Sequence, residues 1–260
     1  MFQLLGINLL LAATPLLAAP HLIEAPTPGA AIANQLIVSG NACGPTALLN
    51  AFRMGNPSWQ HASNTLTGET DKQRIYTIIR EYGMRPSGTI TGHPRWSKKG
   101  VNLSDLCDIG NEMIRGHYLP QLSQEVMFRN RAEAPEKLFN RVHLRLRTSL
   151  EKGFPPLISL RRFVKRGQEW IPIDAHFVTV TALPRKLEKG TTSFAISYVD
   201  PWGGKLCHGN IAIPDRGILT DDAAASPCLE AVFPQASVGK KMVRSGETTA
   251  LTLAAVLGRW

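Results

Sequence analysis

Cys43 is the residue whose position most favours catalytic chemistry, because it directly precedes the pair Gly44-Pro45 at the start of an apolar run. A cysteine is nucleophilic as a thiolate, and the unpaired N–H groups and dipole of a helix N-terminus favour that negative charge. The apolar residues recur at helical spacing, so we predict a helix over 41–55. Gly44, without a side chain, would let a substrate carbonyl approach the sulfur. A cysteine at a helix start is more often structural, so the assignment depends on its partners.

A thiol nucleophile needs a base within hydrogen-bond reach, and His176 is the histidine whose context fits. Of the seven histidines, it alone lies inside an expected strand of alternating pattern. There it shares a face with Val178, Val180 and Ala182, which need a layer to pack against. We expect that layer to be the helix that begins at Cys43, which would bring the imidazole to the helix N-terminus. The alternative is a core histidine bonded to a backbone carbonyl.

Asp200 is the candidate group that orients the imidazole. It ends the apolar side of an expected strand over 193–200, and Pro201 stops the strand there. If this strand pairs antiparallel with the strand of His176 through the loop 184–191, Asp200 falls next to His176. A carboxylate in that place holds the imidazole in one tautomer and favours the imidazolium. The alternative role for an aspartate before proline is to cap a turn.

An acyl-transfer site also needs donors for the oxyanion, commonly a backbone N–H and a side-chain amide. Two amide side chains precede the nucleophile, Gln35 and Asn41. We favour Gln35, which can reach back across a loop, and expect Asn41 to shape the turn into the helix. The alternative for Gln35 is a plain surface glutamine.

These residues are expected to lie on an α+β framework, with helices first and an antiparallel sheet second. Helical spacing predicts further helices over 69–82, 103–115 and 135–152, and a loop over 84–100. Apolar and alternating runs predict strands over 156–163, 171–183, 192–200 and 206–213. For the tail we predict a short strand and a helix over 249–257. The loop 84–100 and the turn 165–168 are expected to form walls of the substrate cleft.

Three motifs in order carry a resemblance to a known family: Asn-Ala-Cys-Gly-Pro-Thr-Ala over 41–47, Ala-His-Phe-Val-Thr-Val over 175–180, and Tyr-Val-Asp-Pro-Trp-Gly over 198–203. They resemble the double-glycine-leader peptidases, the papain-like cysteine peptidases fused to bacteriocin exporters, and their stand-alone relatives. The resemblance spans about 35–213. It implies a papain-like fold with an N-terminal helical part packed on a C-terminal antiparallel β-sheet, a Cys43–His176–Asp200 triad, and Gln35 in the oxyanion hole.

A second, weaker resemblance is to the phytochelatin synthases. They share a Cys-Gly start and a Leu-Asn pair further along the helix, here Leu49-Asn50, but Asp200-Pro201 does not match them. This resemblance implies transpeptidation. We therefore predict a thiol protease that cleaves peptide or isopeptide bonds, with a transpeptidase, or an inactive secreted binding module on the same scaffold, as alternatives.

Composition restricts the partners and cofactors that we expect. The chain has 260 residues, 43% hydrophobic and 19% charged, and a formal charge of +9, which suits an anionic surface partner. No nucleic-acid motif accompanies the basic residues, so the expected partner is a peptide or protein, bound by a monomer. The four cysteines have no paired C-x-x-C spacing, and we predict neither a metal site nor a cofactor.

The N-terminal segment 1–19 is uncharged and apolar, and small residues close it. This pattern is typical of a secretory signal, so we expect an exported protein, secreted or periplasmic, or one anchored by this segment if it is not cleaved. We assign 20–34 to a linker, 35–235 to the peptidase domain and 236–260 to a C-terminal extension. In an exported protein Cys207 and Cys228 could form a disulfide, and the alternative is four free thiols.

Overall fold

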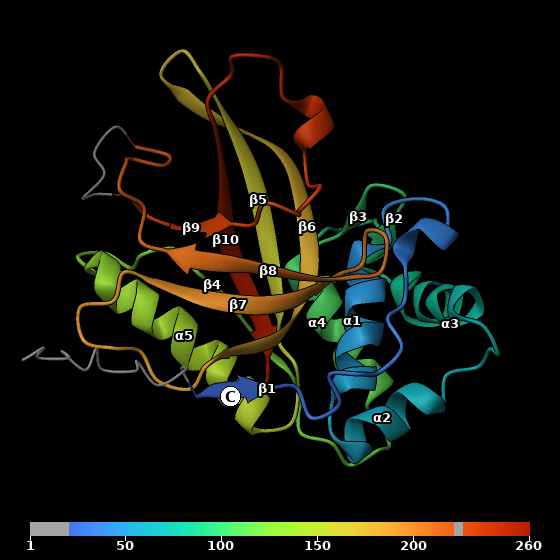
Figure 1. Cartoon of the computed structure of the whole chain (residues 1–260). Coiled ribbons are helices and arrows are strands. Elements are labelled where there is room, and N and C mark those ends of the chain that lie inside the picture. Colours follow the sequence, from blue (N-terminus) through green and yellow to red (C-terminus); the bar gives the residue numbers. More distant parts are fainter. Residues whose placement is uncertain (1–20, 221–225) are drawn as a thin grey trace, which may run out of the picture.

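The computed structural model describes residues 21–220 and 226–260, so the predicted signal segment 1–19 lies outside the described residues. Helices α1 to α4 gather on one side of the molecule, and the strands from β4 to β10 form the other (Figure 1). Helix α5 packs on the strand side. The predicted α+β class is therefore confirmed, with an antiparallel sheet that follows most of the helices.

The helices begin where the local sequence provides caps. Asn56 accepts hydrogen bonds from the N–H groups of Ser58 and Trp59, and Pro57 occupies the first turn of α2, a helix that we did not predict. Thr70 and Gln73 form a capping box at α3, which continues into a π-helical segment. The helices are α1 (Cys43–Met54), α2 (Pro57–Asn64), α3 (Asp71–Thr77), the π-helix η2 (Ile78–Gly83), α4 (Leu103–Met113) and α5 (Pro135–Glu151), with short 3-10 turns η1 (Gln35–Ile37) and η4 (Lys240–Met242).

The strands form one antiparallel sheet that closes into a barrel. Its order is β1-β6-β5-β10-β9-β8-β7, β6 also pairs with β7 to close it, and β4 pairs with β10. The long strand β6 pairs with β5 along most of its length and, towards its C-terminal end, with β1 and β7. The strands are β1 (Leu22–Glu24), β4 (Ser123–Val126), β5 (Leu157–Arg166), β6 (Glu169–Pro184), β7 (Ser193–Asp200), β8 (Lys205–Ala212), β9 (Leu229–Val232) and β10 (Thr249–Gly258), and a separate hairpin joins β2 (Trp96–Ser97) to β3 (Gly100–Val101).

The predicted helix over 249–257 is wrong. These residues form β10, which pairs with β5 on one side and with β9 on the other. Alanine and leucine in this run favour a helix locally, but the run is buried along almost its whole length between two strands. The segment 20–34 likewise contributes β1, which pairs with the far end of β6. Both ends of the described chain thus belong to the same sheet.

The expected packing partner of Val178 and Val180 is also wrong. These residues belong to the apolar cluster that includes Leu160, Tyr198 and other barrel residues, and not to the cluster around α1. The opposite face of β6 meets α1 instead, since Phe177 packs in the apolar cluster that contains the residues of α1. The period-two pattern placed the residues on two faces correctly but could not say which face meets the helix.

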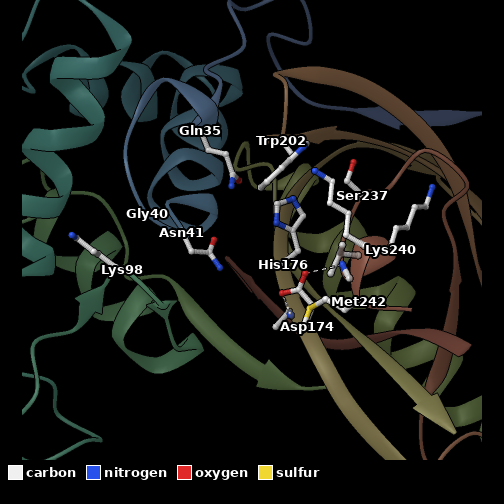
Figure 2. A pocket seen from close by; sticks show the side chains of 14 residues that line it. Gln35, Gly40, Asn41, Lys98, Asp174, His176, Trp202, Ser237, Lys240 and Met242 are labelled. Atoms are coloured by element: carbon white, nitrogen blue, oxygen red, sulfur yellow. Dashed lines mark hydrogen bonds between the residues drawn. The ribbon is translucent and has the colours of Figure 1, made fainter. Parts of the chain in front are cut away.

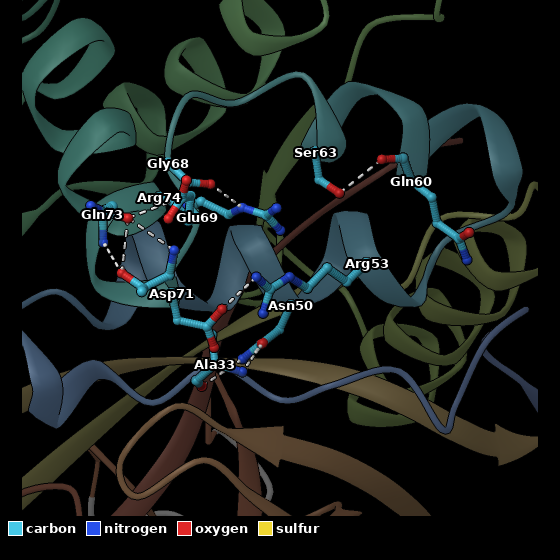
Figure 3. A network of polar contacts seen from close by, with 11 residues as sticks. Ala33, Asn50, Arg53, Gln60, Ser63, Gly68, Glu69, Asp71, Gln73 and Arg74 are labelled. Carbon is cyan, nitrogen blue, oxygen red and sulfur yellow. Dashed lines mark hydrogen bonds and ion pairs between the residues drawn. The ribbon is translucent and has the colours of Figure 1, made fainter.

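Two sets of polar contacts fix α1 in place. On the sheet side, the Thr179 hydroxyl of β6 donates to the Ala47 carbonyl at 2.8 Å. On the other side, the buried Asn50 amide accepts from Ala33 N at 2.7 Å and donates to Ala33 O at 3.2 Å (Figure 3). Arg53, near the end of α1, pairs with an aspartate at the start of α3. The N-terminal end of α1 is therefore positioned relative to β6 and to the segment that precedes η1.

Candidate active site

Cys43 is the first residue of α1, as the sequence predicts, and its side chain is buried. The cap residue, Ala42, makes no side-chain hydrogen bond to the first N–H groups of the helix. These groups therefore point beyond the helix end, beside the sulfur, where they favour negative charge.

Gly44 has a different role from the one that we expected. A Cβ atom added there would collide with Val101 of β3 and would lie 3.3 Å from Leu106 of α4. The glycine is thus required for close packing of α1 against β3 and α4. The proposal that it makes room for a substrate carbonyl has no support in this packing.

His176 and Asp200 come together as the predicted hairpin requires. Strands β6 and β7 are antiparallel, and Thr179 pairs with Val199, so Asp200 lies one position further, diagonal to His176. His176 Nε2 is 2.7 Å from Asp200 Oδ1, and both side chains are buried. The Trp202 N–H donates to the same oxygen at 2.8 Å, which holds the carboxylate in its orientation. Asp200 therefore both caps the turn after β7 and meets the imidazole.

The surroundings of His176 act on its pKa in opposite directions. Burial lowers it, but hydrogen bonds to Asp200 and Cys43, together with the charges of both partners, outweigh burial and raise the pKa of His176 to about 10. Because Nε2 faces Asp200, the ring nitrogen left for the Cys43 thiol is Nδ1. The structure thus brings Cys43, His176 and Asp200 together, with His176 between the other two side chains.

The other three cysteines lack the imidazole neighbour of Cys43. All four cysteines are free, so the Cys207–Cys228 disulfide that we considered does not form and four free thiols are present. Burial raises the pKa of Cys107 to about 11 and that of Cys228 to about 12. Burial and, secondarily, the charge of Asp200 also raise the pKa of Cys207. No imidazole is among the causes that act on these three thiols.

Gln35 lies at the same site, in the 3-10 turn η1. Its backbone N–H donates to Pro201 O at 2.9 Å, and the neighbouring Asn34 side chain accepts from Gly203 N at 3.1 Å. The turn after Asp200 therefore positions Gln35. The Gln35 side chain is buried, and its Oε1 has no hydrogen-bond partner among the described residues. The Gln35 side chain points toward His176, so its amide group faces the site (Figure 2).

A cavity of about 640 Å³ opens beside His176. Cys43 itself is not among its lining residues; the walls are formed by its neighbours in space. Gln35, Asn41 and Lys98 lie on one side in Figure 2, and Asp174, Ser237, Lys240 and Met242 lie on the other. The Asn41 N–H donates to Lys98 O at 3.1 Å, and its carbonyl accepts from Trp96 Nε1 at 2.9 Å.

Of the two cleft walls that we predicted, the loop 84–100 contributes Lys98, whereas the turn 165–168 is absent from the lining. The segment 237–242 and Trp202 line the cavity instead. The sequence contained one signal for Trp202, an aromatic side chain directly after Asp200-Pro201, but none that placed 237–242 here.

In the described part of the chain, no cluster of three or more histidine, cysteine, aspartate or glutamate residues is arranged to hold a metal ion. Across residues 21–220 and 226–260, every helix is too short or too polar to cross a membrane.

Comparisons with known proteins identify no relative. No family model matches the chain, and neither a curated protein nor a solved structure is significantly similar to it.

Proposed function

We propose that this chain is a cysteine peptidase, a thiol hydrolase that cleaves peptide or isopeptide bonds through an acyl-enzyme. The observation that carries the proposal is the contact of a buried imidazole with Asp200 at 2.7 Å and with the thiol of Cys43 at a helix N-terminus. A histidine with a purely structural role needs only one hydrogen-bond partner. A thiolate paired with an imidazolium is characteristic of an activated cysteine nucleophile.

The arrangement of the elements supports a papain-like fold for this enzyme. The nucleophile lies at the start of the helix α1, and the histidine and aspartate lie on adjacent antiparallel strands of a barrel that packs against α1. The same arrangement supports the resemblance of the motifs around Cys43, His176 and Asp200 to the double-glycine-leader peptidases. Membership of that family is part of the proposal.

In the first half of the proposed reaction, the Cys43 thiolate attacks the carbonyl carbon of the substrate. The resulting oxyanion accepts hydrogen bonds from the Cys43 backbone N–H and the Gln35 side-chain amide. The C–N bond then breaks, and the His176 imidazolium transfers its proton to the leaving amine. The product is a thioester on Cys43 beside a neutral imidazole.

In the second half, His176 acts as a base. It takes a proton from a water molecule that attacks the thioester carbonyl, the C–S bond breaks, and the carboxylic acid leaves. The thiolate and the imidazolium are then restored. Transfer to an amine in place of water would make the enzyme a transpeptidase, and analysis of the products with and without an added amine distinguishes the two reactions.

The test is the rate of alkylation by iodoacetamide at about pH 6. We expect one cysteine to react rapidly, and Cys43→Ala to abolish this reaction. We also expect His176→Ala to slow it by about 100-fold or more, since the imidazolium that stabilises the thiolate is lost. Cys107→Ala is the matched control and should leave the rate unchanged, because its buried thiol has a pKa of about 11.

Slow labelling that His176→Ala does not change would show that no activated thiolate exists. The fold would then be a binding module without thiol chemistry. If labelling is fast, digestion of a peptide library by the wild type and by Cys43→Ala should show cleavage by the wild type alone.

A further inference from the structure

The two walls of the cavity beside His176 both present lysines. Lys98 lies on the side of Asn41, and Lys240 and Lys241 line the opposite wall. All three are exposed residues at the rim. From this distribution we propose that the site selects acidic peptides, with Lys98, Lys240 and Lys241 binding carboxylates of the chain near the bond that is cleaved. This inference rests on the proposed function and names the class of its substrate.

Among the described residues, one acidic side chain lines the cavity, Asp174, and it does not offset these lysines. Asp174 Oδ1 accepts from Ala175 N at 2.9 Å, and Oδ2 accepts from Gly239 N at 2.7 Å. Its cross-strand neighbour is Arg162, which is 9% exposed and interacts electrostatically with it. Because both carboxylate oxygens already accept backbone hydrogen bonds and three lysines line the same cavity, the net charge that faces a ligand is positive.

The wall that carries Lys240 and Lys241 is held in place by the same two residues. Arg162 Nε donates to Val238 O at 2.6 Å, and Asp174 bonds the next residue, Gly239. Gly239 has a φ of +64°, and an added Cβ would lie 2.9 Å from Arg162 Cδ. The two lysines follow directly after this anchored pair. They are therefore displayed from a positioned turn. Lys240 Nζ also donates to Pro234 O at 2.7 Å, which leaves its two other N–H groups for a carboxylate.

The opposite wall is tied to the nucleophile. Lys98 O accepts from the backbone N–H of Asn41, two residues before Cys43, and Trp96 of the same hairpin donates to Asn41 O. The position of Lys98 is thus coupled to the start of α1. A cleft with cations on both sides focuses the electrostatic field and attracts anionic ligands, and a salt-dependent affinity follows.

The test measures binding and not turnover. Two fluorescent peptide pools of equal length, one with glutamate and one with glutamine at the same positions, are titrated into Cys43→Ala and followed by anisotropy. At about 50 mM salt we expect the glutamate pool to bind about 10-fold more tightly, and the preference to shrink as the Debye length falls at high salt.

Charge reversal locates the preference. Lys240→Glu/Lys241→Glu in the Cys43→Ala background should abolish it, whereas Lys186→Glu/Lys189→Glu should retain it. The second pair makes the same change in net charge at exposed positions in the β6–β7 connection, away from the cavity. Equal binding of both pools, or a preference that survives the first reversal, would overturn the proposal. So would tighter, competing binding of an RNA oligonucleotide of equal charge.

Failure of this inference is distinguishable from failure of the proposed function. Iodoacetamide carries no charge for the lysines to bind, so its reaction with the wild-type chain tests the Cys43 thiol independently of any preference among peptides. Fast labelling without a preference for the glutamate pool would support the thiol hydrolase and contradict the proposal of an acidic substrate. Slow labelling of the wild type would contradict the proposed enzyme, whichever peptide pool binds more tightly.

Discussion

At the scale of single residues, the site depends on a competition at His176. Burial alone would lower the pKa of the imidazole, as it does at His143. At His176 the two partners reverse the outcome. A buried histidine is thus not diagnostic by itself, and the partners on both ring nitrogens distinguish this one.

We predict that His176 is an imidazolium at pH 8. Its pKa of about 10 in the folded state lies above the unfolded value of about 6.5. Its contribution to stability is therefore fully present below about pH 6.5 and is lost as the pH rises through about 10. Nitrogen chemical shifts of the imidazole would show this state directly. In Asp200→Asn the pKa should fall, and the ring should be neutral at pH 8.

Asp215→Asn is the control for this titration, because Asp215 is exposed and is not one of the residues that line the cavity or act on His176. It should leave the imidazole signals unchanged. A wild-type titration midpoint near 6.5 would contradict the pairing of His176 with Cys43 and Asp200.

Gln35→Ala should separate two kinds of thiol chemistry. Acylation by an activated ester forms an oxyanion, so we expect its rate to fall by about 100- to 1,000-fold when the amide is removed. Alkylation by iodoacetamide forms no oxyanion, and its rate should change little. Stopped-flow measurement of both rates on one preparation makes the comparison. The glutamine of α2, Gln60, bonds to Thr27 and Gly55, and Gln60→Ala should change neither rate. Equal loss of both rates in Gln35→Ala would indicate a structural role.

At the scale of elements, the site is the meeting of one helix N-terminus with one β-hairpin. Neither element carries more than part of the chemistry: α1 supplies the thiol and its N–H groups, and β6 and β7 supply the imidazole and carboxylate. Thr179 joins the two parts through its hydrogen bond to Ala47. Their relative position is therefore a property of packing between elements.

Gly44→Ala tests that packing. Replacing glycine in a helix by alanine ordinarily stabilises by up to about 1 kcal/mol. Here the added methyl would collide with Val101, and overpacking costs about 1–3 kcal/mol, so the collision outweighs the gain. We expect a lower free energy of unfolding by denaturant titration. Gly29→Ala, where the added Cβ meets nothing within 4 Å, should be close to neutral. Equal stability of the two variants would contradict the close packing of α1 on β3.

At the scale of the whole molecule, the barrel joins segments from both ends of the described chain. Strand β10, close to the C-terminus, lies between β5 and β9, and β1 lies at the edge beside β6. The strand of His176 is thus two strands from the C-terminal segment in the sheet. The hairpin of β6 and β7 is expected to lose its support when β10 is disturbed.

Leu253→Ala is predicted to destabilise the whole domain. Leu253 is fully buried in β10, and truncation of such a residue costs about 2–5 kcal/mol. Thermal unfolding and iodoacetamide labelling should then shift together, because one cooperative unit is weakened. Leu206→Ala is the matched control, since Leu206 is 52% exposed on β8 and should cost much less. The opposite result is a thermal transition of Leu253→Ala in which β10 unfolds while the His176 site stays intact. It would show that β10 unfolds as a separate unit.

Short-range patterns in the sequence were sufficient to predict the elements around the candidate site. The helix at Cys43, the hairpin of β6 and β7, and the approach of Asp200 to His176 all follow from patterns that involve near neighbours in the chain: a Gly-Pro start, alternation with period two, and a proline that ends a strand. These patterns express backbone sterics and the burial of one face, which short stretches of sequence reveal.

How those elements meet depends on contacts that local patterns do not reveal. The tertiary structure placed Phe177, and not Val178, against α1, converted the helix-favouring run at Leu253 into a central strand, and brought the segment 237–242 to the cleft through Arg162 and Asp174. Each outcome depends on contacts between residues far apart in the chain. Local propensities differ by about 1 kcal/mol or less per residue, and burial in a shared core outweighs them.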